Sequence, residues 1–332
     1  MRVILAAVAF SLAAVPAFAN DSTAELGAGG LIYVNTEEIE MRSEDLTISM
    51  DEVRVRYEFA NISDHDVSTL VAFPLPDIKG GIDLMQAVPT EDPINFLGFQ
   101  TVVDGARVTA QVQQRASALG VDQTALLIEL GIPLAPHLEA TRNALDRLPA
   151  EEWDRLIGLG LAGIDQFDAG KGWEKHLVPL WLLSTAFYWQ QAFPAGKTVT
   201  VEHSYKPSVG STAGLSFGSK EFRTGPFYPD YERKYCFDAA FLGAVDKRQK
   251  PDGNNSLMEN RIEYILTTAI NWAGAIKKFH LTIDKGAPDN LVSFCGEGVS
   301  KTGPTRFEMT KENFYPDKDL AIMILTPAPW AQ

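Results

Sequence analysis

The chain has 332 residues, of which 45% are hydrophobic and 22% are charged, and its formal net charge is −14 at pH 7. These proportions are typical of globular rather than disordered proteins, and the length suffices for two ordinary domains. A chain this acidic repels phosphate backbones, so we expect no nucleic acid among its partners.

Residues 1–19 have the composition of a secretory signal peptide. Arg2 precedes an apolar run, and Ala17-Phe18-Ala19 is a typical cleavage site with small residues on either side of a larger one. The run is too short to span a bilayer as a permanent helix, and no later apolar stretch reaches that length. We therefore predict cleavage after Ala19, a periplasmic or secreted location, and no integral membrane segment in the mature chain.

Residues 20–113 predict antiparallel β-structure. Apolar and polar residues alternate over residues 46–50 and 53–59, which is typical of strands with one buried and one solvated face. Asp104-Gly105 provides the turn of a further hairpin. The same alternation returns within residues 179–207, so we expect that segment to complete an N-terminal β-sandwich.

Residues 114–178 predict a helical insert within that sandwich. Asp122 is a suitable cap for a short helix that Gly131 ends. Pro149 suits the first turn of a later helix, in which apolar residues recur at helical spacing.

Residues 208–332 predict a second, C-terminal β-rich region with one helix. The helix is expected within residues 230–247, and the strands over residues 262–269, 276–283, 291–295 and 320–325. The predicted fold class is therefore mainly β (α+β), an antiparallel β-sandwich with a helical insert followed by this second region.

The chain contains two cysteines, Cys236 and Cys295. In an oxidising compartment an isolated pair predicts one disulfide. A bridge that closes a loop of roughly sixty residues stabilises the fold by about 4 kcal/mol in the chain-entropy model. No basic partner that would activate either thiol is visible in the sequence.

No residue is predicted to be catalytic or to bind a metal or cofactor. The five histidines are scattered and form no His-x-x-x-His or His-Glu-x-x-His pattern. Gly-x-Ser-x-Gly is also absent. Carboxylates are abundant, and a pair that could hydrolyse glycosides could come together in three dimensions, so a hydrolase of envelope carbohydrate or peptide is the alternative hypothesis.

The aromatic residues Trp173, Tyr188 and Trp189 are the candidate ligand-binding residues. Exposed Trp and Tyr side chains stack on sugar rings or anchor protein partners. The same side chains could instead pack the helical insert against the sandwich, because they flank an apolar run.

The chain resembles a bacterial family of exported proteins that is catalogued as a domain of unknown function, serial four-four-two-four. The resemblance covers nearly the whole mature chain and rests on residues 20–31, 40–46, 71–78 and 313–320. It implies export and implies no particular activity. Residues 55–76 and 193–205 are also similar to the β-sandwich domain of vault protein inter-alpha-trypsin, an interaction module that lacks the insert.

The leading hypothesis is a non-catalytic binding or protein-interaction module of the cell envelope, with an envelope protein or a glycan as its partner. It rests on β-architecture with exposed edges, which offers strand addition and side-chain pockets, and on the missing catalytic motifs. A carbohydrate-binding protein is a further alternative.

Overall fold

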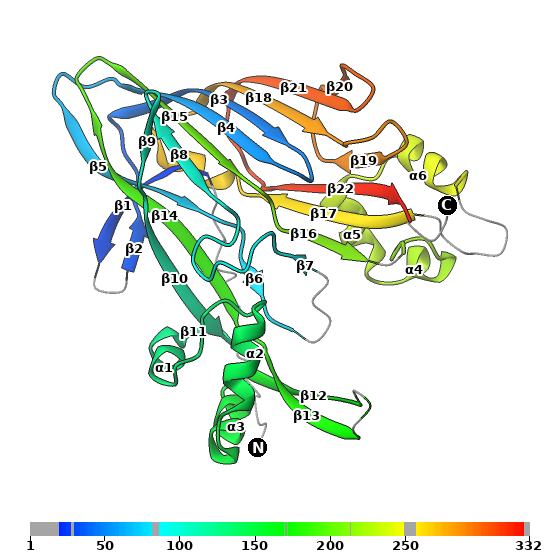
Figure 1. Cartoon of the computed structure of the whole chain (residues 1–332). Coiled ribbons are helices and arrows are strands. Elements are labelled where there is room, and N and C mark those ends of the chain that lie inside the picture. Colours follow the sequence, from blue (N-terminus) through cyan, green and yellow to red (C-terminus); the bar gives the residue numbers. More distant parts are fainter. Residues whose placement is uncertain are drawn as a thin grey trace, which may run out of the picture.

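The computed structural model describes residues 20–27, 30–81, 86–168, 170, 172–212, 214–248 and 257–328. The predicted signal peptide lies outside these residues. The described chain is built around three sheets, here called A, B and C (Figure 1). In spatial order, sheet A contains β11 (Val121–Asp122), β10 (Gln111–Ala118), β14 (Leu182–Phe193), β5 (Val67–Pro74), β1 (Ser22–Gly27) and β2 (Gly30–Tyr33), with β6 (Ile78–Lys79) also paired to β14.

Sheet B draws on both halves of the chain. Its order is β20 (Ser300–Lys301), β21 (Arg306–Phe314), β18 (Ile276–Asp284), β3 (Ile39–Ile48), β4 (Val53–Asn61), β15 (Thr198–Tyr205), β8 (Gln100–Val103) and β9 (Ala106–Val108). Sheet C contains β19 (Leu291–Phe294), β22 (Leu320–Pro327), β17 (Leu257–Tyr264), β16 (Val209–Thr212) and β7 (Gln86–Ala87).

The helices lie outside the sheets. In the insert they are α1 (Thr124–Glu129), α2 (Glu139–Asp146) and α3 (Ala150–Gly158), and beside sheet C they are α4 (Lys220–Thr224), α5 (Tyr228–Tyr235) and α6 (Ala239–Asp246). A 3-10 turn, η1 (Thr267–Asn271), follows β17, and a separate hairpin consists of β12 (Ala162–Asp168) and β13 (Trp173–Pro179).

The alternation of residues 53–59 produces the predicted amphipathic strand, β4. Val53, Val55, Tyr57 and Phe59 are fully buried, whereas Arg54 and its like-facing neighbours reach solvent. The buried face packs in the main hydrophobic core, which joins residues of sheets A, B and C in one cluster. Sheet B thus covers the inner faces of both other sheets, and the predicted mainly β fold is confirmed.

The insert has its own small core, and it is not entirely helical. Leu127, Leu145, Leu156 and Trp181 are buried together there. The hairpin β12–β13 extends from this core, and its outer half is exposed on both faces (Figure 1). Because those outer residues bury neither face, no alternation in the sequence indicated the two strands.

The strands after residue 208 do not form a separate β-region. Strand β18 pairs in parallel with β3 of the N-terminal half, so both halves share sheet B. The single helix expected within residues 230–247 is two helices, α5 and α6, because Cys236 between them adopts a left-handed conformation with φ 51°. The sequence also gave no indication of β21, whose residues are mostly polar.

Candidate functional site

The structure joins the two cysteines. Cys236 at the end of α5 and Cys295 just after β19 form a disulfide with an S–S distance of 2.07 Å. Ser293 supports the same junction, since its hydroxyl donates a hydrogen bond to the Tyr235 carbonyl at 2.9 Å. No cysteine among the described residues is left as a free thiol.

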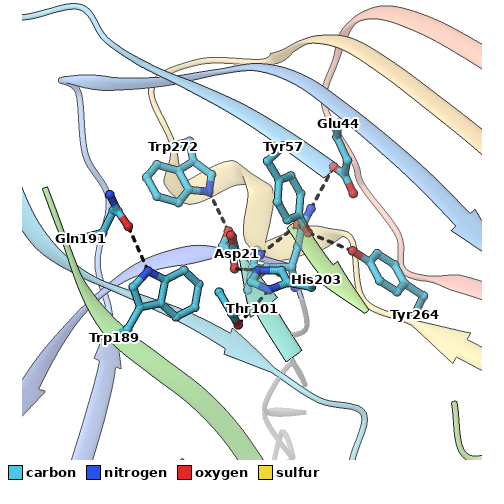
Figure 2. A network of polar contacts seen from close by, with 11 residues as sticks. Asp21, Glu44, Tyr57, Thr101, Trp189, Gln191, His203, Tyr264 and Trp272 are labelled. Atoms are coloured by element: carbon cyan, nitrogen blue, oxygen red, sulfur yellow. Dashed lines mark hydrogen bonds and ion pairs between the residues drawn. The ribbon is translucent and has the colours of Figure 1, made fainter. Parts of the chain in front are cut away.

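The three candidate aromatic residues lie in three different environments. Trp173 begins β13 and is 77% exposed. Trp189 is buried in the main core, where its indole N–H donates to Gln191 Oε1 at 3.1 Å (Figure 2). Tyr188 lies on the opposite face of β14, half-buried against the small cluster around Ala24 and Leu31. The structure therefore does not bring the three together, because neighbours on a strand face opposite sides.

A network of buried polar contacts surrounds Asn20 and Asp21, in the interior between the sheets (Figure 2). The Asn20 backbone N–H donates to Thr268 Oγ1 at 2.6 Å, and the Thr268 hydroxyl donates back to the Asn20 carbonyl at 2.8 Å. The Asn20 side-chain amide donates to Glu44 Oε2 at 3.1 Å and accepts a hydrogen bond from the Tyr57 hydroxyl. Tyr57 also meets the Tyr264 hydroxyl at 3.0 Å. We call these residues the Asn20 cluster.

Asp21, the next residue, makes a second set of contacts, with His203 and Trp272. Its carboxylate lies 3.0 Å from His203 Nε2, and His203 Nδ1 lies 3.1 Å from Thr101 Oγ1. The Trp272 indole N–H donates to the Asp21 carbonyl at 2.6 Å. This order of carboxylate, imidazole and hydroxyl is that of a hydrolytic triad.

The order of groups alone does not make a catalytic site. The side chains of His203 and Asp21 are both 0% exposed. The imidazole stacks against Phe99 at 5.0 Å between ring centroids, and Phe73 lies at 4.8 Å. A hydrolase needs its hydroxyl and its base within reach of a substrate, and these rings exclude both substrate and water. The geometry therefore supports a structural role, in which Asp21 and Thr101 satisfy a buried histidine.

Two carboxylate oxygens in this interior have no hydrogen-bond partner among the described residues, Glu44 Oε1 and Asp21 Oδ2. Burial raises the pKa of Glu44 to about 8, although the hydrogen bond from Asn20 opposes the shift. Burial also raises the pKa of Asp21, against the opposing effect of His203. In both groups, loss of hydration is the main cause of the raised pKa, and of the two only Asp21 has a histidine beside it.

The sequence carried one signal for this interior. His203 occupies the same alternate positions as Val199, Val201 and Tyr205, which places it with them on the buried face of its strand. A histidine on a buried face requires polar partners, and this requirement could have prompted a search for them. The partners themselves lie far away in the chain, at Asp21 and Thr101, so no local motif indicated them.

One open cavity lies between the edges of sheets B and C. It has a volume of about 1090 Å³ and is bordered by β19, β21 and α6. Apolar side chains of Val292, Phe294, Phe307 and Met309 line its walls. Its charged lining residues are the lysines Lys285, Lys301, Lys311 and Lys318 and the acids Asp238, Glu297, Asp317 and Asp319. We call this cavity the B–C cleft.

Several charges in the B–C cleft already have structural partners. Asp238 caps α6 by accepting from the Phe241 N–H, and Asp319 accepts from the backbone of Leu266 and Thr267. The Lys285 ammonium donates to the Pro288 and Asn290 carbonyls. Lys301 and Lys311 contact side chains instead, since Lys301 lies over the Phe307 ring and Lys311 pairs with a Glu297 side chain that is 93% exposed.

A second cavity, of about 700 Å³, lies on the outer face of sheet A between β2, β10 and β14. Leu31 and Leu182 contribute apolar surface, and Asp77 and Arg115 contribute charge. Burial raises the pKa of Asp77, and a hydrogen bond with Ser184 opposes that shift. We call this cavity the sheet A groove. No group of His, Cys, Asp and Glu in the described part of the chain is arranged to hold a metal ion.

Most of the chain matches one known protein family. The model of the family described as "Domain of unknown function (DUF4424)" matches residues 19–323. The chain belongs to this family. The predicted family resemblance is therefore confirmed. No curated protein sequence matches the chain.

Among solved structures, one similar chain is a Legionella pneumophila protein described, provisionally, as nutrient-binding. The match has 14% sequence identity and a TM-score of 0.42, and it covers 93% of this chain and 70% of the other. A likeness at this level carries no argument about function. Within the described residues, no helix has the length and apolar character needed to cross a bilayer.

Proposed function

We propose that this member of the family is an exported, non-catalytic binding protein of the bacterial envelope. The single observation that carries the proposal is the contrast between its interior and its cavities. The one carboxylate–imidazole–hydroxyl array found in the described residues is sealed, whereas the B–C cleft is open, lined by both apolar and charged side chains, and large enough for a small ligand.

The lining of the B–C cleft favours a ligand with an apolar body and an anionic group. Phe294, Phe307 and Met309 would bury the apolar body, which provides most of the binding free energy at such sites. Lys301 and Lys311 would pair with a carboxylate or phosphate at the mouth of the cleft. Export and cleavage after Ala19 belong to the same proposal, and the tripartite composition of residues 1–19 supports them.

Binding can be measured with laurate as the probe, by displacement of the fluorescent anion anilinonaphthalene sulfonate from the purified mature chain. We expect Val292→Trp to fill the cleft and weaken binding of both compounds at least about tenfold. We expect the double variant Lys301→Met, Lys311→Met to weaken laurate more than dodecanol, because it removes charge and keeps most of the apolar stem.

The matched control is Lys79→Met, which removes a lysine from the sheet A groove instead. Lys79→Met should leave the affinities for laurate and for dodecanol unchanged. The cleft is not the binding site if neither laurate nor anilinonaphthalene sulfonate binds the mature chain. The same conclusion follows if both bind the Val292→Trp variant as tightly as the unchanged chain.

One observation favours a second candidate, recognition of a glycan. Trp173 is 77% exposed on the projecting hairpin, so its ring is available for stacking on a sugar. Titration of a panel of envelope glycans against tryptophan fluorescence would show it, with Trp173→Ala as the variant that loses the response. An unchanged spectrum across the panel would remove this candidate.

A further inference from the structure

Asn20 lies where the chain would begin after cleavage, yet it is fully buried. Its backbone N–H and carbonyl are both held by the Thr268 hydroxyl, and its side chain is held by Glu44 and Tyr57. The ends of most chains are exposed and poorly ordered unless specific contacts tie them down. Here the contacts come from β3 and β4, which follow one another in the chain, and from η1, which lies more than two hundred residues later.

Two hydrogen-bond acceptors near Asn20 are not used by the described residues. In the intact chain, the Asn20 nitrogen is a peptide N–H with a single hydrogen, and Thr268 accepts it. Cleavage would turn this nitrogen into an ammonium with two additional N–H donors. Within the described residues, the same interior holds two carboxylate oxygens that lack a partner, Glu44 Oε1 and Asp21 Oδ2. The added donors therefore match the unused acceptors in number.

The charges match as well. Around Asn20, the titratable groups are Asp21 and Glu44, the histidine His203 and the phenols Tyr57 and Tyr264. An ionised Glu44 in this setting is a buried anion without a cation, which is strongly unfavourable. A positive charge at the Asn20 backbone nitrogen would supply the missing cation. Glu44 already contacts the side chain of this same residue.

We propose that the Asn20 cluster is a binding site for the chain's own new amino terminus, and that removal of residues 1–19 locks the core through an ion pair between the Asn20 α-ammonium and Glu44. The inference rests on the cleavage included in the proposed function. A leader peptidase would break the bond between the Ala19 carbonyl carbon and the Asn20 nitrogen. Water gives its OH to that carbon and a hydrogen to the nitrogen, and the amine takes one further proton from solvent.

The test compares two chains made by cutting a fusion protein in vitro, so that it does not depend on export. One begins at Asn20 with a free amine, and the other keeps Ala19 as a single-residue extension. Unfolding in urea at pH 7 is measured for each, with and without Glu44→Gln. We expect Glu44→Gln to lower the folding equilibrium constant at least about tenfold more in the free-amine chain than in the extended chain.

Glu52→Gln is the matched control, because Glu52 is on the surface and pairs with Arg54. It should have the same small effect in both chains. Equal effects of Glu44→Gln in the two chains would overturn the proposal.

A second measurement needs no variant and therefore survives a failure of Glu44→Gln to fold. The rate at which an acylating reagent modifies the Asn20 α-amine is measured in the folded and the urea-unfolded free-amine chain. We expect at least about a hundredfold protection in the folded chain, because the amine becomes accessible only when the structure opens. Equal rates would overturn the proposal. An exported chain that kept residues 1–19 would instead contradict the proposed cleavage, and mass spectrometry separates the two failures.

Discussion

His203 shows how burial decides the role of a residue. Its contacts with Asp21 and Thr101 have the order of a catalytic triad, but the side chain is 0% exposed and aromatic rings surround it. The alternation of Val199, Val201, His203 and Tyr205 in the sequence is consistent with the buried face on which His203 lies. It could not supply Asp21 as the partner, because the two residues are 182 positions apart and only the tertiary fold brings them together.

Replacement of His203 by alanine should therefore destabilise the fold rather than abolish a reaction. The variant leaves a cavity among the rings and an unpaired buried carboxylate on Asp21, and we expect a loss of about 3–5 kcal/mol in the free energy of unfolding. Urea denaturation followed by tryptophan fluorescence measures it. His65→Ala, on an exposed turn, should cost less than about 0.5 kcal/mol. A loss below about 1 kcal/mol for His203→Ala would show that the network is not structural.

Glu44 gives a prediction about pH. Burial raises its pKa from 4.5 to about 8 in the intact chain, so the folded state keeps a proton that the unfolded state releases above pH 4.5. The Glu44 contribution to stability must therefore decline as the pH rises from 4.5 to 8. In the chain extended by Ala19, urea unfolding at pH 5 and pH 8 should show this decline, and Glu44→Gln should remove it. A decline that Glu44→Gln leaves intact would mean that other groups cause it.

At the scale of elements, strands with strict alternation were predictable and the projecting hairpin was not. β4 buries one face, and that face is visible in the sequence as Val53, Val55, Tyr57 and Phe59. The inner half of β12–β13 is anchored by Ala162 and Leu177 in the insert core, whereas the outer half is mostly exposed, and polar contacts add to this anchoring. Asp146 at the end of α2 provides them, since its carboxylate accepts from the Leu177 N–H at 2.9 Å and meets His176 Nδ1 at 2.7 Å.

The Asp146–His176 contact should make the position of the hairpin depend on pH. The hydrogen bond with Asp146 raises the pKa of His176 above 6.5. Stability from this pair is fully present below pH 6.5 and is lost as the pH rises through the raised pKa. We expect Asp146→Asn to accelerate proteolysis of the hairpin more at pH 5.5 than at pH 9. Equal acceleration at both pH values would show that only the neutral hydrogen bonds matter.

At the scale of the whole molecule, the main departure from the sequence prediction is the shared sheet B. The β18–β3 pairing joins segments more than two hundred residues apart, and strand partners at such a distance leave no trace in local alternation. The main core contains residues from both halves of the chain, for example Tyr57 and Tyr264. Neither half should therefore complete a core of its own.

This sharing predicts that residues 20–207 do not fold alone. A fragment cut at residue 207 loses β20, β21 and β18 from one end of sheet B and all the strands of sheet C except β7. We expect it to lack the near-ultraviolet circular dichroism of the full chain and to be digested rapidly by proteases. The full chain should unfold in one transition, with fluorescence and far-ultraviolet signals that coincide. A fragment with a cooperative melt would contradict a shared core.

The central claim is that the working form of the protein begins at Asn20, with its new amino terminus inside the core and its two cysteines joined. The most direct test is the intact mass of the protein purified from the bacterial envelope without reductant. We predict the mass of residues 20–332, less the two hydrogens lost on forming the Cys236–Cys295 bond. A chain that retains Met1, or one that starts at Asn20 with two free thiols, would contradict the account.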